Sequence, residues 1–323
     1  MKINDSDFEA AIANGKRMLS SCRLCPRQCS VDRIGGHKGF CGCSSNASVS
    51  SWLLHKGEEP VLIGRNGAGT VFFGGCTLSC VFCQNWQISS KKTSGAFSSE
   101  KSAEELGRIF LDLQDHGAAN IDLVTPTMHI PSIIEALFWA KRNGLSLPVA
   151  YNTNSYMSRE AFGLISPFVD IWLADLKYYS EANALKYSSA ARYNAIAFES
   201  IRDMYEKRPL LVTDNEGRAL KGCIVRILLL PDGSDEAEKS LLKLAEHGIL
   251  PSVSIMGQFS PLYRAGEFPE LLTKTSAERI DYLASLADSL GFENVWFQYD
   301  DASEIFSPDF SKDNPFGQAN PPL

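Results

Sequence analysis

The sequence contains no long run of basic residues and no long run of apolar residues. The first absence argues against a nucleic-acid-binding protein, and the second against a membrane protein. No basic run is longer than Lys91-Lys92, and the net charge is −7. Since binding to nucleic-acid phosphates depends on clustered Lys and Arg, we expect no nucleic-acid partner. The most apolar segment, 224–230, contains Arg226 and is far too short to span a bilayer. We therefore expect no membrane association either.

The N-terminal stretch MKINDSDFEAAIANGKRML also lacks the apolar segment of a signal peptide. We therefore expect a cytoplasmic protein, in which nine cysteines point to metal binding or catalysis before disulfides. Hydrophobic residues make up 44% of the 323 positions, which is enough for a sizeable core. This length suits one large domain with an appendage, or two domains.

Strand-like and helix-like segments alternate from residue 70 onward. Ser102 and Glu105 are spaced as a helix capping box, and 211–222 is typical of an inserted hairpin. Six or seven strands, most of them followed by a helix, predict a parallel α/β architecture, either a partial barrel or an open doubly wound sheet. We expect strands at 70–75, 120–126, 148–153, 170–178, 223–230, 253–259 and 294–299, and helices at 102–117, 131–144, 191–207, 235–247 and 276–290.

The chain divides into three parts by composition. Residues 1–69 combine an amphipathic helix near 6–18, a cysteine-rich segment and a strand-like stretch at 47–54, and they are interpreted as a metal-binding module. Residues 70–300 form the α/β part. Residues 301–323 are rich in Pro, Asn and Asp, so we expect a loosely ordered tail.

Polar residues interrupt or follow the apolar strands. In a β/α barrel, functional groups gather at the C-terminal ends of the strands, so we expect these residues to share one site. Asp175 and Lys177 have a simpler alternative, a structural ion pair, because residues i and i+2 of a strand share a face. The polar residues are Thr125, Thr127, Asn152, Thr153, Asn154, Asp175, Lys177, Arg226 and Gln258.

Three cysteines lie close together in GGCTLSCVFCQNWQIS, residues 74–89. Thiolates at this spacing can hold three irons of a [4Fe–4S] cluster and leave the fourth iron without a protein ligand. An open coordination position is where metal chemistry can occur. The alternative, a structural zinc knot, usually shows paired CxxC elements. The spacing of Cys76, Cys80 and Cys83, with Phe82 before the last of them, resembles the radical S-adenosylmethionine (SAM) superfamily.

The resemblance extends over residues 20–262. It implies an α/β fold, a partial (β/α)6 TIM-type barrel with a cysteine-rich N-terminal extension and the cluster on the loop after strand one. It also implies an oxidoreductase that cleaves SAM to a 5′-deoxyadenosyl radical and abstracts hydrogen from a substrate. The implied partners are a flavodoxin- or ferredoxin-type electron donor and, as the substrate, either a glycyl-radical protein or another protein, with a small-molecule substrate as a further alternative. CRLCPRQC, LHKGEEP, GAGTVFFGGCTLSCVFCQNWQIS, NIDLVTPTMH, PVAYNTNSY, DIWLADLKY and VRILLLP resemble, in this order, the PflX branch of proteins related to pyruvate formate-lyase activating enzymes.

The resemblance also implies roles for single residues. The family has TPTH where this chain has TPTMH, so Thr125, Pro126 and Thr127 stand where activating enzymes bind the SAM amine, and the extra Met128 leaves the role of His129 open. The backbone at Phe82 is implied to contact the adenine, and Gln258 stands in place of a histidine near the adenosine. Lys177 and Arg226 are implied to bind the methionyl carboxylate. The residues implied to bind SAM and a monovalent cation are Asn152, Thr153, Asn154 and Asp175.

The N-terminal cysteines offer one further metal site. Cys22, Cys25, Cys29 and Cys41 match the family's pattern for four ligands, which leaves Cys43 or His37 spare. A structural zinc ion and an auxiliary iron–sulfur cluster both fit the spacing. We favour zinc slightly, because zinc would stabilise a short segment that has little core of its own.

Two other function classes compete with an enzyme. A ferredoxin-like electron carrier needs four cysteines per cluster and no polar site on a large barrel. A zinc-dependent interaction module leaves the polar strand ends unexplained.

Overall fold

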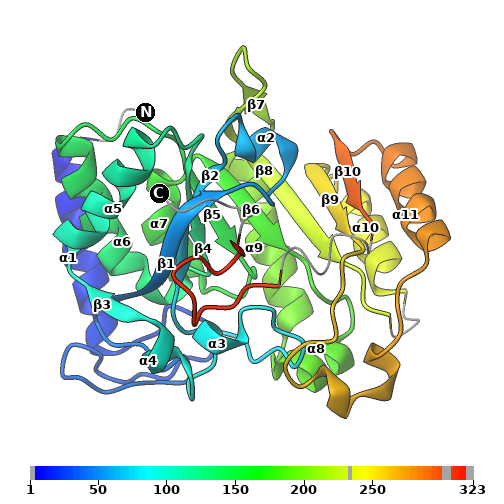
Figure 1. Ribbon diagram of the computed structural model, residues 1–323, viewed down its shortest axis with the longest axis horizontal. Helices are drawn as coiled ribbons and strands as arrows, with labels where there is room; N and C mark the ends of the chain where they lie inside the picture. The colour runs from blue at the N-terminus through cyan, green and yellow to red at the C-terminus, as the bar shows by residue number, and fades with distance from the viewer. Residues whose placement is uncertain (1–3, 232–234, 300–306, 318–323) are drawn as a thin grey trace.

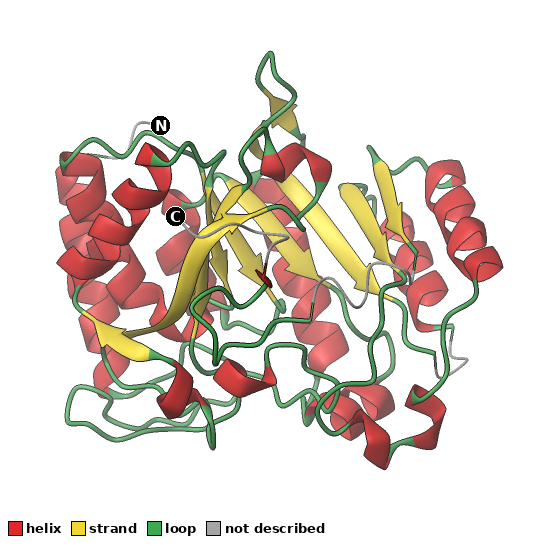
Figure 2. Ribbon diagram, in the orientation of Figure 1, coloured by secondary structure: helices red, strands yellow, loops and turns green. Residues whose placement is uncertain are grey.

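One mixed sheet forms the centre of the computed structural model, which describes residues 4–231, 235–299 and 307–317 (Figures 1 and 2). The strand order is β10-β9-β8-β6-β5-β4-β2-β1-β3, and the short β7 pairs with β8. The strands are β1 Ala47–His55, β2 Ala68–Phe73, β3 Ser99–Lys101, β4 Ile121–Val124, β5 Val149–Thr153, β6 Ile171–Asp175, β7 Val212–Thr213, β8 Ala219–Leu228, β9 Ser252–Met256 and β10 Val295–Gln298.

The strands from β2 to β10 are wound as in a barrel. β2, β4, β5, β6, β8, β9 and β10 are parallel neighbours in chain order, and the order never reverses as it does in a doubly wound sheet. On its other side β2 pairs with β1, not with β10, so the described strands do not close into a ring. The predicted parallel α/β fold is confirmed, and β10 adds a seventh parallel strand to the six that the resemblance implied.

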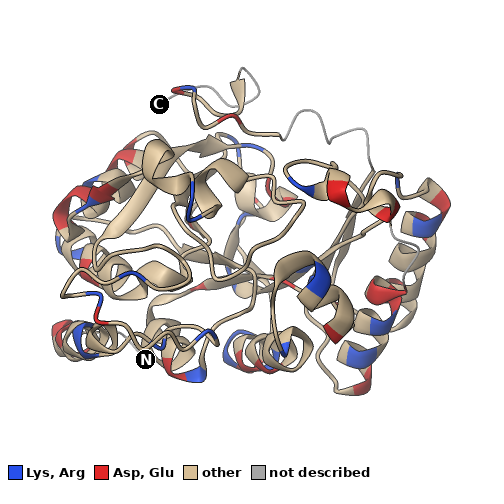
Figure 3. Cartoon of the chain, turned by 90° about the horizontal axis from the view of Figure 1, so that it is seen from below, with Lys and Arg blue, Asp and Glu red and all other residues tan. Residues whose placement is uncertain are grey.

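The helices lie around this sheet, and charged residues of both signs are mixed along them at the periphery in Figure 3. The predicted capping box is present, since the Ser102 hydroxyl accepts a hydrogen bond from the Glu105 amide at 3.2 Å. The longer helices are α1 Asp5–Ser20, α5 Ala103–Asp115, α6 Ile130–Arg142, α7 Arg159–Ile165, α8 Glu181–Ser188, α9 Tyr193–Lys207, α10 Glu236–Glu246 and α11 Ala277–Ser289. The short helical turns are α2 Pro60–Ile63, α3 Trp86–Ser89, α4 Ser94–Phe97, η1 Thr127–His129, η2 Ser166–Phe168, η3 Ala265–Glu267 and η4 Pro269–Leu271.

The N-terminal part is built into the sheet. β1 pairs antiparallel with β2 from Val49 opposite Phe73 to His55 opposite Ala68. α1 packs on α6, with the rings of Phe8 and Phe138 at 5.1 Å between centroids. The predicted metal-binding module therefore continues the same sheet and shares its core.

The described part of the C-terminal segment, 307–317, is packed and not loosely ordered. Phe310 is buried against Phe72, with 5.6 Å between ring centroids, and its amide donates to the Gln87 side chain at 2.9 Å. Apolar burial and this hydrogen bond outweigh the Pro- and Asn-rich composition. Residues 300–306 and 318–323 of the expected tail lie outside the described residues. Within the described ranges, no helix is long and apolar enough to cross a membrane.

Candidate functional site

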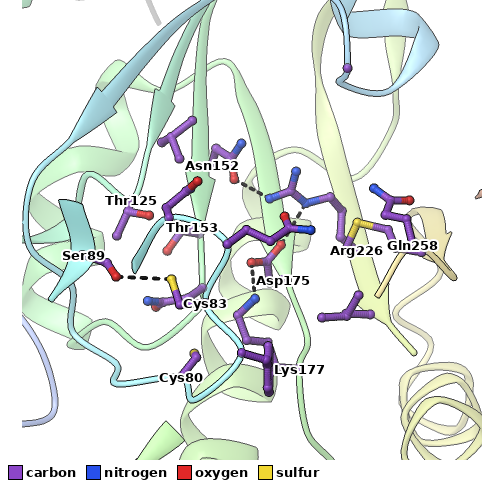
Figure 4. A pocket seen from close by; sticks show the side chains of 18 of the residues that line it. Cys80, Cys83, Ser89, Thr125, Asn152, Thr153, Asp175, Lys177, Arg226 and Gln258 are labelled. Carbon is purple, nitrogen blue, oxygen red and sulfur yellow. Dashed lines mark hydrogen bonds and ion pairs between the residues drawn. The ribbon is translucent and has the colours of Figure 1, made fainter. Parts of the chain in front are cut away.

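A cavity of about 230 Å³ opens at the C-terminal ends of the parallel strands (Figure 4). It brings together side chains that are far apart in the chain, from His55 to Phe316. The predicted site residues that line it are Cys76, Cys80, Phe82, Cys83, Thr125, Asn152, Thr153, Asn154, Asp175, Lys177, Arg226 and Gln258. One cavity therefore collects the three cysteines and the polar strand ends.

The TPTMH segment contributes only its first residue to this cavity. Thr125 lines the cavity. Its backbone φ is +58°, a value that residues other than glycine rarely adopt. Pro126 does not line the cavity, and Thr127 is buried beneath it, where its hydroxyl accepts a hydrogen bond from Tyr151 at 3.2 Å. His129 Nε2 donates to the Gly74 carbonyl at 2.9 Å, and burial lowers the pKa of this histidine to about 4. His129 is therefore a neutral structural residue that holds the start of the cysteine loop.

The cysteine loop leaves β2 through a tight glycine turn. Gly75 has a φ of +81°, and a Cβ there would lie 2.4 Å from Cys43 Sγ, so this position requires glycine. Each of the three following thiols meets a polar partner. The Leu78 amide and Asn154 Nδ2 donate to Cys76 Sγ at 3.3 and 3.4 Å, Ser188 Oγ donates to Cys80 Sγ at 2.9 Å, and Ser89 Oγ lies 3.2 Å from Cys83 Sγ. Hydrogen bonds to cysteine sulfurs tune iron–sulfur centres.

The three thiols line one cavity. A [4Fe–4S] cluster binds each thiolate through a different iron, whereas zinc gathers its ligands around one centre. The single CxxxCxxC element, without the paired CxxC elements that are usual for zinc, favours a cluster over a zinc knot. Burial raises the pKa of all three thiols, that of Cys83 to about 11, so metal binding must release protons.

Arg226 on β8 lies at the centre of a charged network beside the cysteines (Figure 4). Its Nε donates to Asp175 Oδ1 at 2.8 Å, its Nη2 to Asn152 Oδ1 at 2.5 Å and its Nη1 to Glu58 Oε2 at 3.2 Å. Lys177 Nζ lies 2.8 Å from Asp175 Oδ2. Burial alone would raise the pKa of Asp175, but the adjacent guanidinium and ammonium groups hold it below its usual range. In contacts with described residues, Arg226 uses three of its five N–H groups and Lys177 one of its three, and both side chains line the cavity.

The same contacts bear on the expected monovalent cation. The oxygen atoms of Asn152 and Asp175, which the resemblance assigns to that cation, already accept hydrogen bonds from Arg226. The guanidinium thus supplies a positive charge where the cation was expected, and the cation remains a prediction. The structural ion pair considered for Asp175 and Lys177 is present, and both side chains also line the cavity.

Sequence reasoning missed the contribution of the segment after β1. His55, Gly57, Glu58 and Glu59 line the cavity, and Phe316 reaches it from the C-terminal segment. Burial raises the pKa of both glutamates, with Arg226 opposing the shift. Two adjacent glutamates directly before the apolar PVLI were the available signal, because buried carboxylates are rare unless they are paired.

The four N-terminal cysteines also come together. Cys22, Cys25, Cys29 and Cys41 line a second cavity of about 20 Å³. Cys43 lies outside it and donates to the Gly74 carbonyl at 3.4 Å, so it is a structural thiol beneath the cysteine loop. His37 does not line this cavity either.

Comparison with known proteins agrees with the architecture. No family model matches the chain. An uncharacterised protein of Methanocaldococcus jannaschii, MJ0674, is 28% identical over 302 residues, which are 92% of this chain and 82% of that protein. Among solved structures, a radical SAM methyltransferase from Sphaerobacter thermophilus superposes with a TM-score of 0.51 at 15% identity, covering 74% of this chain and 69% of the methyltransferase. SuiB of Streptococcus suis gives a TM-score of 0.47 at 12% identity, covering 70% of this chain and 47% of SuiB.

The similarity to the methyltransferase indicates the class of fold. The chain has the α/β fold of radical SAM enzymes, with a mostly parallel sheet and a cysteine-rich N-terminal region. At 15% identity the likeness concerns the fold, and the chemistry has to be argued from the site itself.

We expect Arg226→Ala to destabilise the protein, because it leaves Glu58 buried without its guanidinium partner. Breaking a buried ion pair from one side costs about 3–5 kcal/mol. Urea unfolding should show a large loss for Arg226→Ala and a partial recovery for Arg226→Ala/Glu58→Gln, which also removes the stranded charge. Arg264→Ala, which breaks the exposed pair with Glu267, is the matched control and should cost about 1 kcal/mol or less. A double variant no more stable than Arg226→Ala would contradict this account.

Proposed function

We propose that this protein is a radical SAM enzyme. Cys76, Cys80 and Cys83 would hold a [4Fe–4S] cluster that keeps one iron open, and SAM would bind in the cavity of about 230 Å³ beside it. When bound, the cluster would supply the electron that splits SAM into methionine and a 5′-deoxyadenosyl radical. The observation that carries the proposal is that three hydrogen-bonded thiols share one cavity with the polar strand ends.

The charged network provides a binding position for the methionyl carboxylate of SAM. Lys177 and Arg226 both line the cavity, and charge-assisted hydrogen bonds to a carboxylate are among the strong ones. Asp175 and Glu58 hold these cations in place through contacts of 2.8 and 3.2 Å. The role of the two acidic groups is therefore to fix the orientation of the donors.

The cavity also has aromatic lining residues, which suit the adenine. The rings of Phe82 and Phe259 pack edge to face with 5.6 Å between centroids, and both residues line the cavity. Gln258 precedes Phe259 and lines the same cavity. Phe316 adds a third aromatic side chain, from the C-terminal segment, and packs against His55 and Phe72.

The test of the proposal is SAM cleavage by protein reconstituted anaerobically with iron and sulfide. With a strong one-electron reductant, we expect the native protein to form 5′-deoxyadenosine and methionine, and Cys80→Ala to form neither, because one iron loses its ligand. Cys223→Ala is the matched control, since Cys223 is buried in β8 and does not line the cavity. Cleavage at the native rate by Cys80→Ala would refute the assignment.

Lys177→Ala should weaken SAM binding without preventing cluster assembly. Losing one charge-assisted hydrogen bond costs about 1.5–3 kcal/mol, which is roughly a tenfold to hundredfold loss of affinity. Asp175 keeps its contact with Arg226, so folding should be retained. Titration calorimetry on reconstituted protein measures the effect, and Lys186→Ala, at an exposed pair with Glu270, is the control. Equal affinities for native protein and Lys177→Ala would remove Lys177 from the site.

We further propose, from the resemblance to the PflX branch, that the hydrogen is taken from a glycine of a partner protein. The described strands leave the sheet open between β10 and the β1–β2 side, which is compatible with a substrate larger than a metabolite. A flavodoxin- or ferredoxin-type protein would supply the electron.

The partner proposal is tested by electron paramagnetic resonance (EPR). Reduced enzyme and SAM, mixed with candidate glycyl-radical proteins of the same genome, should give a doublet that disappears when the partner's glycine is substituted. If no candidate gives a doublet while 5′-deoxyadenosine still forms, the substrate is of another class.

A further inference from the structure

The C-terminal end of α8 is docked on the cysteine loop. The residue that follows this helix has a left-handed backbone conformation, with a φ of +51°, and ends it. The last carbonyls of a helix have no partner inside the helix, so they need partners outside it. The Tyr187 carbonyl accepts a hydrogen bond from the Val81 amide at 2.8 Å. The Ser188 carbonyl accepts one from the Ser79 amide at 3.1 Å. The loop is therefore fixed to α8 on both sides of Cys80.

This docking places the hydroxyl group of Ser188 on the thiol of Cys80. Ser188 Oγ lies 2.9 Å from Cys80 Sγ and 2.7 Å from the hydroxyl group of Tyr178, which follows β6. Ser188 and Tyr178 are both 0% exposed, and neither lines the cavity of about 230 Å³. The two hydroxyl groups therefore approach the sulfur from the protein interior and not from the cavity in which SAM would bind.

The direction of these hydrogen bonds follows from the chemistry of a metal-bound cysteine. The ligand form of cysteine is the thiolate, which has no proton and can only accept. A serine hydroxyl has one proton to donate, and at this position that proton goes to Cys80. Ser188 Oγ then accepts from the phenol of Tyr178, which keeps its proton because burial raises its pKa well above the usual range. Tyr178, Ser188 and Cys80 thus form one chain of two hydrogen bonds.

Such a chain stabilises negative charge on the sulfur. A donor whose own oxygen accepts a hydrogen bond is polarised and donates more strongly, and in the protein interior the effect is larger than in water. Reducing a buried cluster adds negative charge, which burial opposes unless donors compensate for it. Hydrogen bonds to the cysteine sulfurs are one of the factors that set the reduction potential of an iron–sulfur cluster. The side-chain donors near the other two thiols, Asn154 and Ser89, line the cavity itself.

We propose that Tyr178 and Ser188 are positioning residues that raise the reduction potential of the cluster at Cys76, Cys80 and Cys83, by stabilising the Cys80 thiolate in the reduced state. Reduction adds one electron from the flavodoxin- or ferredoxin-type donor and moves no proton along the chain. The cluster is thereby easier for this donor to reduce. The inference rests on the proposed function, because it assumes the cluster.

The test is a redox titration of the cluster, followed by EPR on anaerobically reconstituted protein without SAM. Ser188→Ala removes the donor and should shift the midpoint potential to a more negative value. Tyr178→Phe leaves the Ser188 hydroxyl less polarised, so it should give a smaller shift in the same direction. Ser188→Thr keeps a hydroxyl group and should restore a potential close to the native one. The double variant Tyr178→Phe/Ser188→Ala should shift no further than Ser188→Ala, because the chain acts through a single hydrogen bond to Cys80.

Tyr151→Phe is the matched control. It removes another buried phenol, which donates to Thr127 at 3.2 Å, and neither of these residues lines the cavity, so the potential should stay at the native value. Native potentials in Ser188→Ala and Tyr178→Phe, or an equal shift in Tyr151→Phe, would overturn the inference and leave the proposed function intact. If Ser188→Ala fails to assemble the cluster, Tyr178→Phe decides alone. A native protein that assembles no redox-active cluster would overturn both.

Discussion

The geometry of the site depends on the contacts of the Arg226 guanidinium, which is largely but not fully buried. It binds Asp175 at the end of β6, Asn152 at the end of β5 and Glu58 in the segment that follows β1. A charge in this position is stable only when its partners are held close and oriented. One side chain thereby ties together two parallel strands and the N-terminal region, and it sets the position of Lys177 through their shared partner Asp175.

The cysteine loop after β2 is the second constraint. It leaves the strand through Gly75, whose close contact with Cys43 admits no side chain, and it is held from below by His129 at the Gly74 carbonyl. On one side of this loop lie Cys76 and the large cavity, and on the other lies Thr77 with the N-terminal cysteines. The N-terminal region is therefore part of the functional unit, because it supports the loop, lines the first cavity and forms the second.

Much of this arrangement could be predicted from local patterns. The alternation of strands and helices gave the parallel architecture, and the Ser102–Glu105 capping box is present as predicted. Polar residues at strand ends predicted Asn152, Asp175 and Arg226 as neighbours, because parallel strands bring their C-terminal ends to one edge. The short helices α7 and α8 were missed, since they have only 7 and 8 residues and their periodic signal is weak.

What the sequence determined by itself was the chemistry that is available: the three spaced thiols, the four further cysteines and the polar strand ends. Tertiary structure decided which of these groups meet. It placed Thr125, which has a positive φ, at the cavity but buried Thr127 and His129, which hydrogen-bond to Tyr151 and to the Gly74 carbonyl. It also brought Glu58 to Arg226, 168 positions away. Local patterns specify strands and turns, whereas such long-range pairing depends on how β1 packs beside β2, which no local pattern encodes.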